Sequence, residues 1–211
     1  MSMASMPDWS QLQPGFADPV HDAQNVFRAV LDALARPGRL RGVGSRLAPS
    51  EEASVAARAT LLALADATTA VWLQCVLPEL ASALRFHTGA PLLDDASALS
   101  GAHFALLTDP AHCPALERFA LGTAESPEDS TTLIVDVPTL AAGHTGCEGL
   151  RLRLRGPGIA THADVTVGGL DAAFWQARAA LASRFPAGLD LLIGAGDTVL
   201  GLPRTTHVEV C

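Results

Sequence analysis

Helix-like and strand-like patterns alternate along most of this chain, and that order restricts the possible fold more than any other feature. Apolar residues at helical spacing predict helices over 18–36, 50–66, 78–86, 113–120 and 171–185. Aliphatic and β-branched runs predict strands over 40–43, 70–76, 102–108, 132–137, 149–155, 189–193 and 198–202. Such alternation is typical of an α/β structure in which helices flank a largely parallel sheet.

Several predicted elements also carry signals at their ends. Asp18 and Pro19 suit a helix start, because the Asp side chain accepts a backbone N–H and proline needs no partner there. The run 50–52 places two acids at the positive end of a second helix, and Asp171 predicts the start of the last one. The final two strands are joined by a four-residue loop, so they predict an antiparallel hairpin and a mixed sheet.

Length and composition bound the domain organisation. The 211 residues are 49% apolar and 17% charged, which is enough material for one well-packed domain. We expect an N-terminal arm over 1–17 and a single α/β domain over 18–211. Apolar runs stay well below the roughly 18 residues of a membrane helix, and the first ten residues lack signal-peptide features. We therefore expect a cytoplasmic protein that does not enter a membrane.

The charged residues exclude several classes of function. The formal net charge is −8, and all 14 basic residues are arginine. Without lysine the chain cannot form the usual Schiff base with pyridoxal phosphate or supply a P-loop lysine. The acidic balance argues against sequence-independent nucleic-acid binding, which needs an excess of positive charge. We expect neither a cofactor nor a nucleic-acid partner.

Motifs for metal binding and hydrolysis are also missing from the sequence. The four cysteines, Cys75, Cys113, Cys147 and Cys211, are widely spaced, and the seven histidines show no short metal-ligand spacing. We expect reduced, mostly buried thiols and no metal site. The sequence contains neither a Gly-x-Ser-x-Gly elbow nor a Gly-x-Gly-x-x-Gly loop, so no catalytic residue is identified.

Two polar clusters remain as candidate ligand sites. They are Arg85, His87 and Thr88, and Arg204, Thr205, Thr206 and His207. Arginine binds phosphate or phosphonate oxygens bidentately, hydroxyl groups add donors, and histidine adds a charge near neutral pH. If the clusters converge, they form a site for a small dianion. They suit buried hydrogen-bonded residues or a subunit interface equally well.

The run 149–155 alternates leucine and arginine, so it predicts a half-exposed strand. Its arginines, Arg151, Arg153 and Arg155, share one face. They suit a solvated surface or an acidic partner better than a phosphate site.

Several segments of the chain, including both polar clusters, resemble the PhnH subunit family of the bacterial carbon–phosphorus lyase system. The resemblance follows these segments in order: Phe27-Arg28, Arg36-Pro37-Gly38, Leu62-Ala63-Leu64-Ala65-Asp66, Val71-Trp72-Leu73, Leu84-Arg85-Phe86-His87-Thr88, Gly156-Pro157-Gly158-Ile159, Phe185-Pro186-Ala187-Gly188-Leu189-Asp190 and 203–211. The last segment is the most specific, and the middle of the chain, 109–149, resembles the family mainly in pattern.

The resemblance implies a fold similar to the large domain of pyridoxal-phosphate-dependent transferases, without the cofactor site. It implies a homodimer that also joins PhnG-, PhnI- and PhnJ-type subunits in a core complex. With PhnG-, PhnI- and PhnL-type proteins, such subunits support displacement of adenine from ATP by an alkylphosphonate, giving a ribose 1-phosphonate 5-triphosphate. The chain is then expected to serve this activity as a subunit and not to catalyse it alone.

Two other functions stay open at this point. The first is an autonomous phosphonate- or nucleotide-binding transferase, which requires Arg85, His87, Arg204 and His207 to face one cleft. The second is a storage or sensing module without chemistry. For dimerisation, Trp9, Trp72 and Trp175 are available as interface anchors, although core burial suits each of them better.

Overall fold

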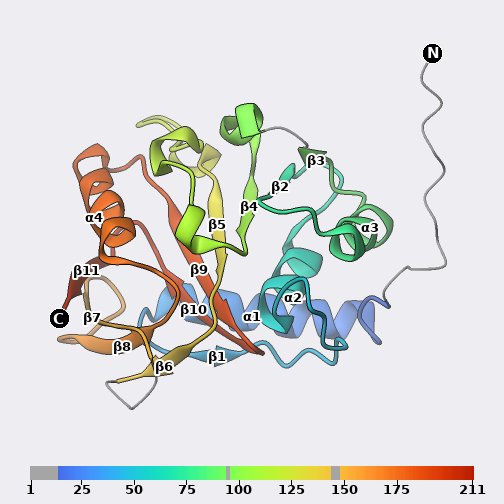
Figure 1. Ribbon diagram of the computed structural model, residues 1–211, viewed down its shortest axis with the longest axis horizontal. Helices are drawn as coiled ribbons and strands as arrows, with labels where there is room; N and C mark the ends of the chain where they lie inside the picture. The colour runs from blue at the N-terminus through green and yellow to red at the C-terminus, as the bar shows by residue number, and fades with distance from the viewer. Residues whose placement is uncertain (1–13, 94–95, 144–147) are drawn as a thin grey trace.

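Two β-sheets and four α-helices make up the part of the chain that the computed structural model describes, residues 14–93, 96–143 and 148–211 (Figure 1). The larger sheet has the strand order β1-β10-β9-β5-β4-β2-β3. Its strands are β1 (Arg41–Gly42), β2 (Val71–Leu73), β3 (Leu92–Leu93), β4 (Phe104–Leu107), β5 (Thr132–Asp136), β9 (Asp190–Ala195) and β10 (Thr198–Leu202).

Within this sheet the adjacent strands β3, β2, β4, β5 and β9 run parallel, whereas β10 is antiparallel to both of its neighbours. This arrangement confirms the predicted mixed, largely parallel sheet and the hairpin of β9 and β10. The central strand, β5, contributes Leu133, Ile134 and Val135, all of which are buried. Because successive side chains point to opposite faces, both faces of the sheet need a cover.

Helices cover one face of the larger sheet. They are α1 (Pro19–Ala35), α2 (Val55–Leu64) and α3 (Pro78–His87), and α1 packs on β10 while α2 packs on β9. Ile134 and Leu192 point to this side and join a core with Val26 of α1, Leu61 of α2 and Leu84 of α3. The fold thus confirms helices packed on the parallel sheet, as the alternating sequence pattern predicts.

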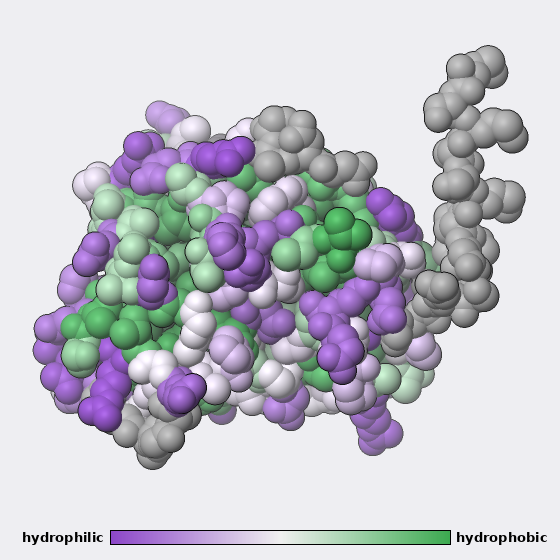
Figure 2. All heavy atoms as spheres, in the orientation of Figure 1, coloured by the Kyte–Doolittle hydropathy of each residue, from purple (hydrophilic) through white to green (hydrophobic). Residues whose placement is uncertain are grey.

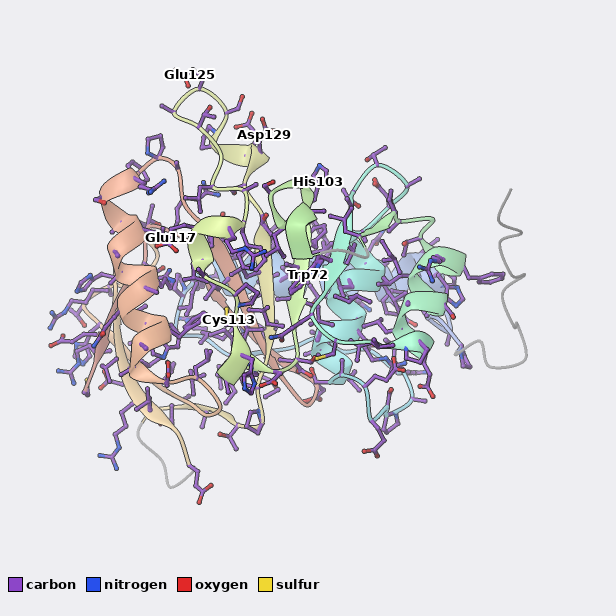
Figure 3. The ribbon with its side chains drawn as sticks, turned by 45° about the horizontal axis from the view of Figure 1, so that its top comes forward. Trp72, His103, Cys113, Glu117, Glu125 and Asp129 are labelled. Atoms are coloured by element: carbon purple, nitrogen blue, oxygen red, sulfur yellow. The ribbon has the colours of Figure 1, made fainter. Side chains whose placement is uncertain are left out.

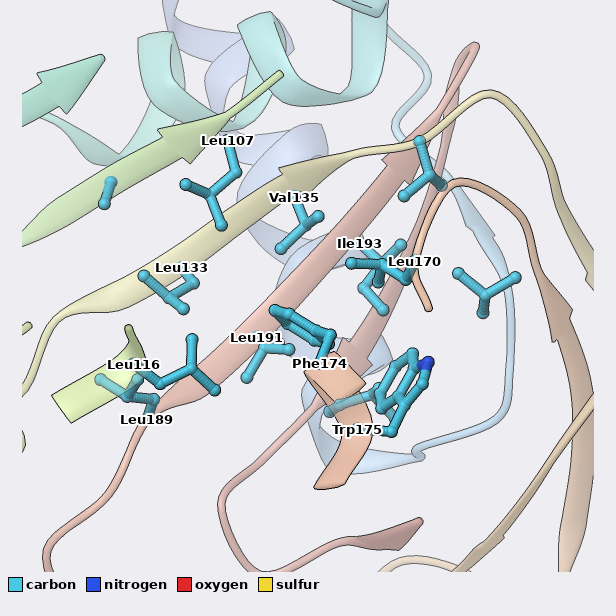
Figure 4. Packing of buried hydrophobic residues seen from close by; sticks show 14 of the residues in the cluster. Leu107, Leu116, Leu133, Val135, Leu170, Phe174, Trp175, Leu189, Leu191 and Ile193 are labelled. Carbon is cyan, nitrogen blue, oxygen red and sulfur yellow. The ribbon is translucent and has the colours of Figure 1, made fainter. Parts of the chain in front are cut away.

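The opposite face carries α4 (Ala172–Ala180) and a second sheet. Leu133, Leu191 and Ile193 pack against Phe174 and Trp175 of α4 (Figure 4). The second sheet is antiparallel with the order β11-β7-β8-β6. Its strands are β6 (Leu140–Ala142), β7 (Leu150–Arg155), β8 (Ala163–Val167) and β11 (His207–Val210).

The second sheet adds to the predicted architecture, which was a mixed, largely parallel sheet flanked by helices. Leucine–arginine alternation does place a half-exposed strand at β7, where Leu152 and Leu154 are buried and Arg151 and Arg155 are exposed. The pattern fixes which face is buried but not the partner strands. One of these, β11, lies about fifty residues further along the chain, pairing His207 with Arg155.

Helix starts match the sequence signals at two places and differ at a third. Asp18 caps α1, since its side chain accepts the N–H of His21, and Asp171 caps α4 in the same way. The second helix begins at Val55 with Ser54 as its cap, and not at 50 as predicted. Glu52 instead accepts the backbone N–H groups of Glu79 and Leu80 at 3.0 and 2.8 Å, so it caps α3.

The helix predicted over 113–120 is wrong. The structure has two separate 3₁₀ turns in this region, Pro110–His112 and Leu116–Arg118. Pro114 lies between them and cannot donate a backbone hydrogen bond, which prevents a continuous helix. Similarly, α4 ends at Ala180 and continues as a 3₁₀ turn over Leu181–Arg184.

The described tryptophans are buried, as core packing predicts, whereas two of the cysteines differ from expectation in their exposure. Trp72 and Trp175 are only 5% and 2% exposed, so they cannot serve as dimer anchors. Cys75 and Cys211 are exposed, contrary to the expected burial, and burial raises the pKa of the Cys113 thiol to about 11. Trp9, Cys147 and most of the expected arm lie outside the described residues. Within the described ranges, no helix has the length and apolar character needed to cross a bilayer.

Candidate functional site

The first polar cluster lies at the C-terminal end of α3. Thr88 is the C-cap of this helix, and its backbone N–H and its hydroxyl both donate to the carbonyl of Leu84, at 3.0 and 2.7 Å. The His87 ring meets the Phe86 ring edge-on, with 5.0 Å between centroids, and packs on the backbone of Gly15. Thr88 is therefore a capping residue, and His87 helps to seat the segment before α1.

Arg85 is exposed and lines a hollow of about 500 Å³ at the carboxyl end of β2. Trp72, Cys75, Pro78 and Leu92 line the same hollow, which is mainly apolar. Ligands of open α/β sheets bind outside the carboxyl ends of the parallel strands. Arg85 is thus the candidate that lies where this fold class holds ligands.

Arg204, in the second cluster, is held inside the fold by all five of its guanidinium N–H groups. It donates to Asp190 through Nε and Nη2, at 3.3 and 2.7 Å, and to Ser130 through Nη2 at 2.5 Å. Nη1 donates to the carbonyls of Pro127 and Pro186, at 2.9 and 3.1 Å. An anion would have to displace these partners, so the geometry gives Arg204 a structural role.

Two of those partners, Pro127 and Ser130, belong to the connection between β4 and β5. Figure 3 shows that this connection projects from the body of the molecule and carries the acidic residues Glu125 and Asp129. Arg204 therefore ties the base of the projecting connection to the segment between β10 and β11.

The other residues of the second cluster divide between core and surface. Thr206 is 3% exposed, and its carbonyl accepts a hydrogen bond from Arg178 at 2.9 Å. Thr205 is exposed, and exposed His207 opens β11. Only Thr205 and His207 of this cluster present side chains to solvent in the way that a ligand site requires.

The structure does not bring the two clusters together. Arg85 lies on α3 and Arg204 lies just ahead of β11, and these elements are at opposite ends of the molecule (Figure 1). Arg85 and Arg204 also line different hollows. A single dianion site built from both clusters is therefore not supported, whereas ligand binding by either cluster separately stays a prediction.

Comparison with known proteins identifies the family. Residues 14–209 match the model of a family described as bacterial phosphonate metabolism protein (PhnH). The chain belongs to the PhnH family. A Rhizobium meliloti (strain 1021) protein named alpha-D-ribose 1-methylphosphonate 5-triphosphate synthase subunit PhnH is 39% identical over 203 residues, covering 95% of this chain and 97% of the relative. A Stutzerimonas stutzeri protein named putative C-P lyase subunit protein HtxG is 32% identical over 187 residues, covering 89% and 86%.

This PhnH-family chain also holds a buried arginine that sequence reasoning missed. Arg178 donates to the carbonyls of Thr206 and Pro203, at 2.9 and 2.8 Å, and burial lowers its pKa to about 10. It fixes α4 to the segment that leads into β11. The sequence did contain a signal for this role. Arg178 follows Phe174 and Trp175 on the apolar face of the helix, where a guanidinium needs hydrogen-bond partners inside the protein.

A second missed residue of this PhnH-family chain is Asp136, at the carboxyl end of β5. One of its oxygens accepts the backbone N–H of Ser54 at 2.8 Å, next to the start of α2. The other oxygen is buried and has no hydrogen-bond partner among the described residues. Burial raises the pKa of Asp136, although the bond from Ser54 opposes this shift. A lone acid within the apolar run 132–137 was the signal in the sequence.

The described ranges hold no group of three or more His, Cys, Asp or Glu side chains placed to bind a metal ion.

Proposed function

We propose that this chain is a non-autonomous subunit of a carbon–phosphorus lyase core complex in alkylphosphonate catabolism. In this role it supports transfer of a phosphonate to the ribose of ATP with release of adenine, which forms a ribose 1-phosphonate 5-triphosphate. The observation that carries the proposal is the 39% identity, over 95% of the chain, to a protein named as a subunit of alpha-D-ribose 1-methylphosphonate 5-triphosphate synthase. The second relative is named as a putative C-P lyase subunit.

The site geometry supports a subunit role over an autonomous enzyme. An autonomous transferase that uses Arg85, His87, Arg204 and His207 needs these side chains in one cleft. Arg85 and Arg204 line different hollows, and the donors of Arg204 are already used inside the fold. A chain with this geometry needs groups from other subunits to complete a site for ATP and phosphonate.

Finer features of the proposal come from the family resemblance. The expected partners are PhnG-, PhnI-, PhnJ- and PhnL-type subunits and a second copy of the chain, in the cytoplasm. The fold is expected to be similar to the large domain of pyridoxal-phosphate-dependent transferases, with no cofactor, and to form one domain over 18–211. A phosphonate or ATP bound by this subunit is expected at Arg85, in the hollow at the carboxyl end of β2.

The experiment separates assembly from activity. The tagged chain is co-expressed with PhnG-, PhnI- and PhnJ-type subunits and purified, and adenine release from ATP is measured after the PhnL-type protein and methylphosphonate are added. Arg85→Ala should leave the complex intact and lower adenine release, whereas Arg46→Ala, at an exposed arginine between β1 and α2, should change neither. Failure of the unchanged chain to co-purify with any of these subunits contradicts the proposal.

A further inference from the structure

The four-stranded sheet has an open edge at β11. The strands at the edges of the two sheets are β1, β3, β6 and β11. Of these, β1 and β3 have two residues and β6 has three, whereas β11 has four. Very short edge strands offer few groups to an incoming chain, so β11 is the edge best able to pair with one. It lies at the outer end of the molecule, beside the C-terminus (Figure 1).

The register of β11 shows which backbone groups face outward. Cys211 donates its N–H to the carbonyl of Arg151 at 2.9 Å, and Glu209 pairs with Arg153 in the same ladder. In an antiparallel pair the bonded residues alternate, so the N–H and C=O groups of Val208 and Val210 point away from β7. These four groups accept and donate no hydrogen bond within the described part of the chain.

One row of solvent-facing side chains alternates in charge toward this edge. Glu209 lies opposite Arg153, which lies opposite Asp164 and binds it through two hydrogen bonds of 2.9 and 3.1 Å. In the neighbouring row, His207 lies opposite Arg155. Opposite charges on adjacent strands stabilise a sheet, and like charges destabilise it. A further strand that continues this row has a basic residue beside Glu209, and an acidic residue beside His207 offsets the positive charge of Arg155 in the neighbouring row.

Apolar surface accompanies the open edge. Val210 is 39% exposed, and the segment before β11 lines a shallow hollow of about 500 Å³ with Pro203 and Thr205. Phe185, which is 64% exposed, and Pro186 form the apolar part of this hollow. Figure 2 shows apolar surface bordered by polar groups at the same end of the molecule. The hollow precedes the His207 end of β11, so a paired segment that continues past this end has apolar surface to contact in addition to its backbone partners.

Charge favours a different chain over a second copy at this edge. Two copies paired antiparallel through the outward groups of Val208 and Val210 would be centred on Glu209. The two Glu209 carboxylates would then lie directly opposite each other, which is destabilising. Self-pairing that uses all the open groups is thus opposed by the same residue that attracts a basic partner.

We propose that β11 receives an extended segment of a partner subunit as a fifth strand of the small sheet. The segment carries Lys or Arg beside Glu209, Asp or Glu beside His207, and apolar residues beside Val208 and Val210. The backbone bonds provide affinity and the alternating side chains provide specificity, as in other cases of strand addition. This inference rests on the proposed function, because the occupant is a subunit of the same complex.

The test compares amide hydrogen exchange in the chain alone and in its purified complex with PhnG-, PhnI- and PhnJ-type subunits, read by NMR after the complex is dissociated. The Val208 and Val210 amides should exchange fast in the chain alone and become protected in the complex. Val210→Pro deletes an outward N–H and no bond to β7, so it should weaken assembly about tenfold or more. Val210→Ala keeps that N–H and should weaken assembly much less.

Glu209→Lys gives an independent arm, because it reverses the charge that selects the occupant. It should weaken assembly more than Glu209→Gln, while the thermal stability of each isolated variant shows that the fold is retained. Unchanged exchange at Val208 and Val210 in an intact complex overturns the inference and leaves the proposed function standing. Protection that appears in the chain alone as its concentration rises identifies a second copy as the occupant and also overturns it. Failure to form any complex contradicts the proposed function and the inference together.

Discussion

The guanidinium of Arg204 lies side-on against the carboxylate of Asp190, in the segment that joins the hairpin of the large sheet to the last strand of the small one. The backbone N–H of Arg204 also donates to Asp190 at 2.7 Å. The Arg204 side chain thus joins three parts of the fold: β9, the connection between β4 and β5, and the segment that leads into β11. This relationship explains why a polar sequence near the end of the chain can be structural.

Replacing Arg204 by alanine should destabilise the fold. The change leaves a largely buried carboxylate and the carbonyls of Pro127 and Pro186 without their donor. Breaking a buried pair costs about 3–5 kcal/mol, and partial exposure of Asp190 should reduce this to about 2–3 kcal/mol in urea unfolding. Arg204→Lys keeps the charge but not the five donors, so it should recover only part of the loss. A free energy of unfolding equal to that of the original chain would contradict the structural role.

Arg178→Ala should also lower stability, through its buried carbonyl partners. The substitution removes the N–H groups that donate to the carbonyls of Thr206 and Pro203, and it opens a space beneath α4. Unsatisfied buried groups cost about 1–3 kcal/mol each, so a loss of about 3 kcal/mol is expected in urea unfolding. Arg178→Met fills much of the space without donors, and it should remain clearly less stable than the original chain. Full stability of Arg178→Met would show that packing alone matters at this position.

Glu52→Ala tests the cap that the fold supplies to α3 from outside the helix. The carboxylate of Glu52 accepts the N–H groups of Glu79 and Leu80, where the helix dipole also favours negative charge. Loss of such a cap costs about 1 kcal/mol. Glu51→Ala removes an exposed neighbouring carboxylate and is the matched control, for which little change is expected. Equal losses for the two variants, measured by thermal unfolding, would show that the cap adds nothing specific.

The alternation of helices and strands predicted the parallel sheet because local patterning decides burial along each element. Leu133, Ile134 and Val135 form an aliphatic run that only a strand covered on both faces accommodates. The small sheet was not predictable in the same way, because β7 pairs with β11 about fifty residues later and nothing local specifies that partner. Glu52 shows the same limit of local patterns. Its carboxylate does lie at the start of a helix, but that helix is α3 and not the one that follows it in the sequence.

The candidate site shows why residue type alone does not assign a role. Arg85 and Arg204 look equivalent in sequence, as arginines beside hydroxyl and imidazole groups. Tertiary contacts separate them: Asp190, Pro127 and Pro186 use the donors of Arg204, whereas Arg85 lines an open hollow. Those contacts join distant segments, so no local pattern indicates them.

Asp136→Asn should change how stability depends on pH. Burial raises the pKa of Asp136 above its ordinary value of 3.8. A carboxyl with a raised folded-state pKa stabilises the fold most below the unfolded pKa and loses that contribution as pH rises through the folded pKa. Asparagine does not ionise, and its oxygen can still accept the N–H of Ser54. The variant should therefore gain stability over the original chain as pH rises above 3.8. Urea unfolding across this range checks the prediction, and a constant difference between the two proteins would contradict it.

Adenine release from ATP in the presence of methylphosphonate tests the central claim most directly. The assay compares this chain alone, the PhnG-, PhnI- and PhnL-type proteins without it, and the full mixture. We predict adenine release above background only in the full mixture, because the chain contributes as a subunit and holds no complete site by itself. Adenine release by the purified chain alone, or undiminished release when it is omitted, would contradict the account.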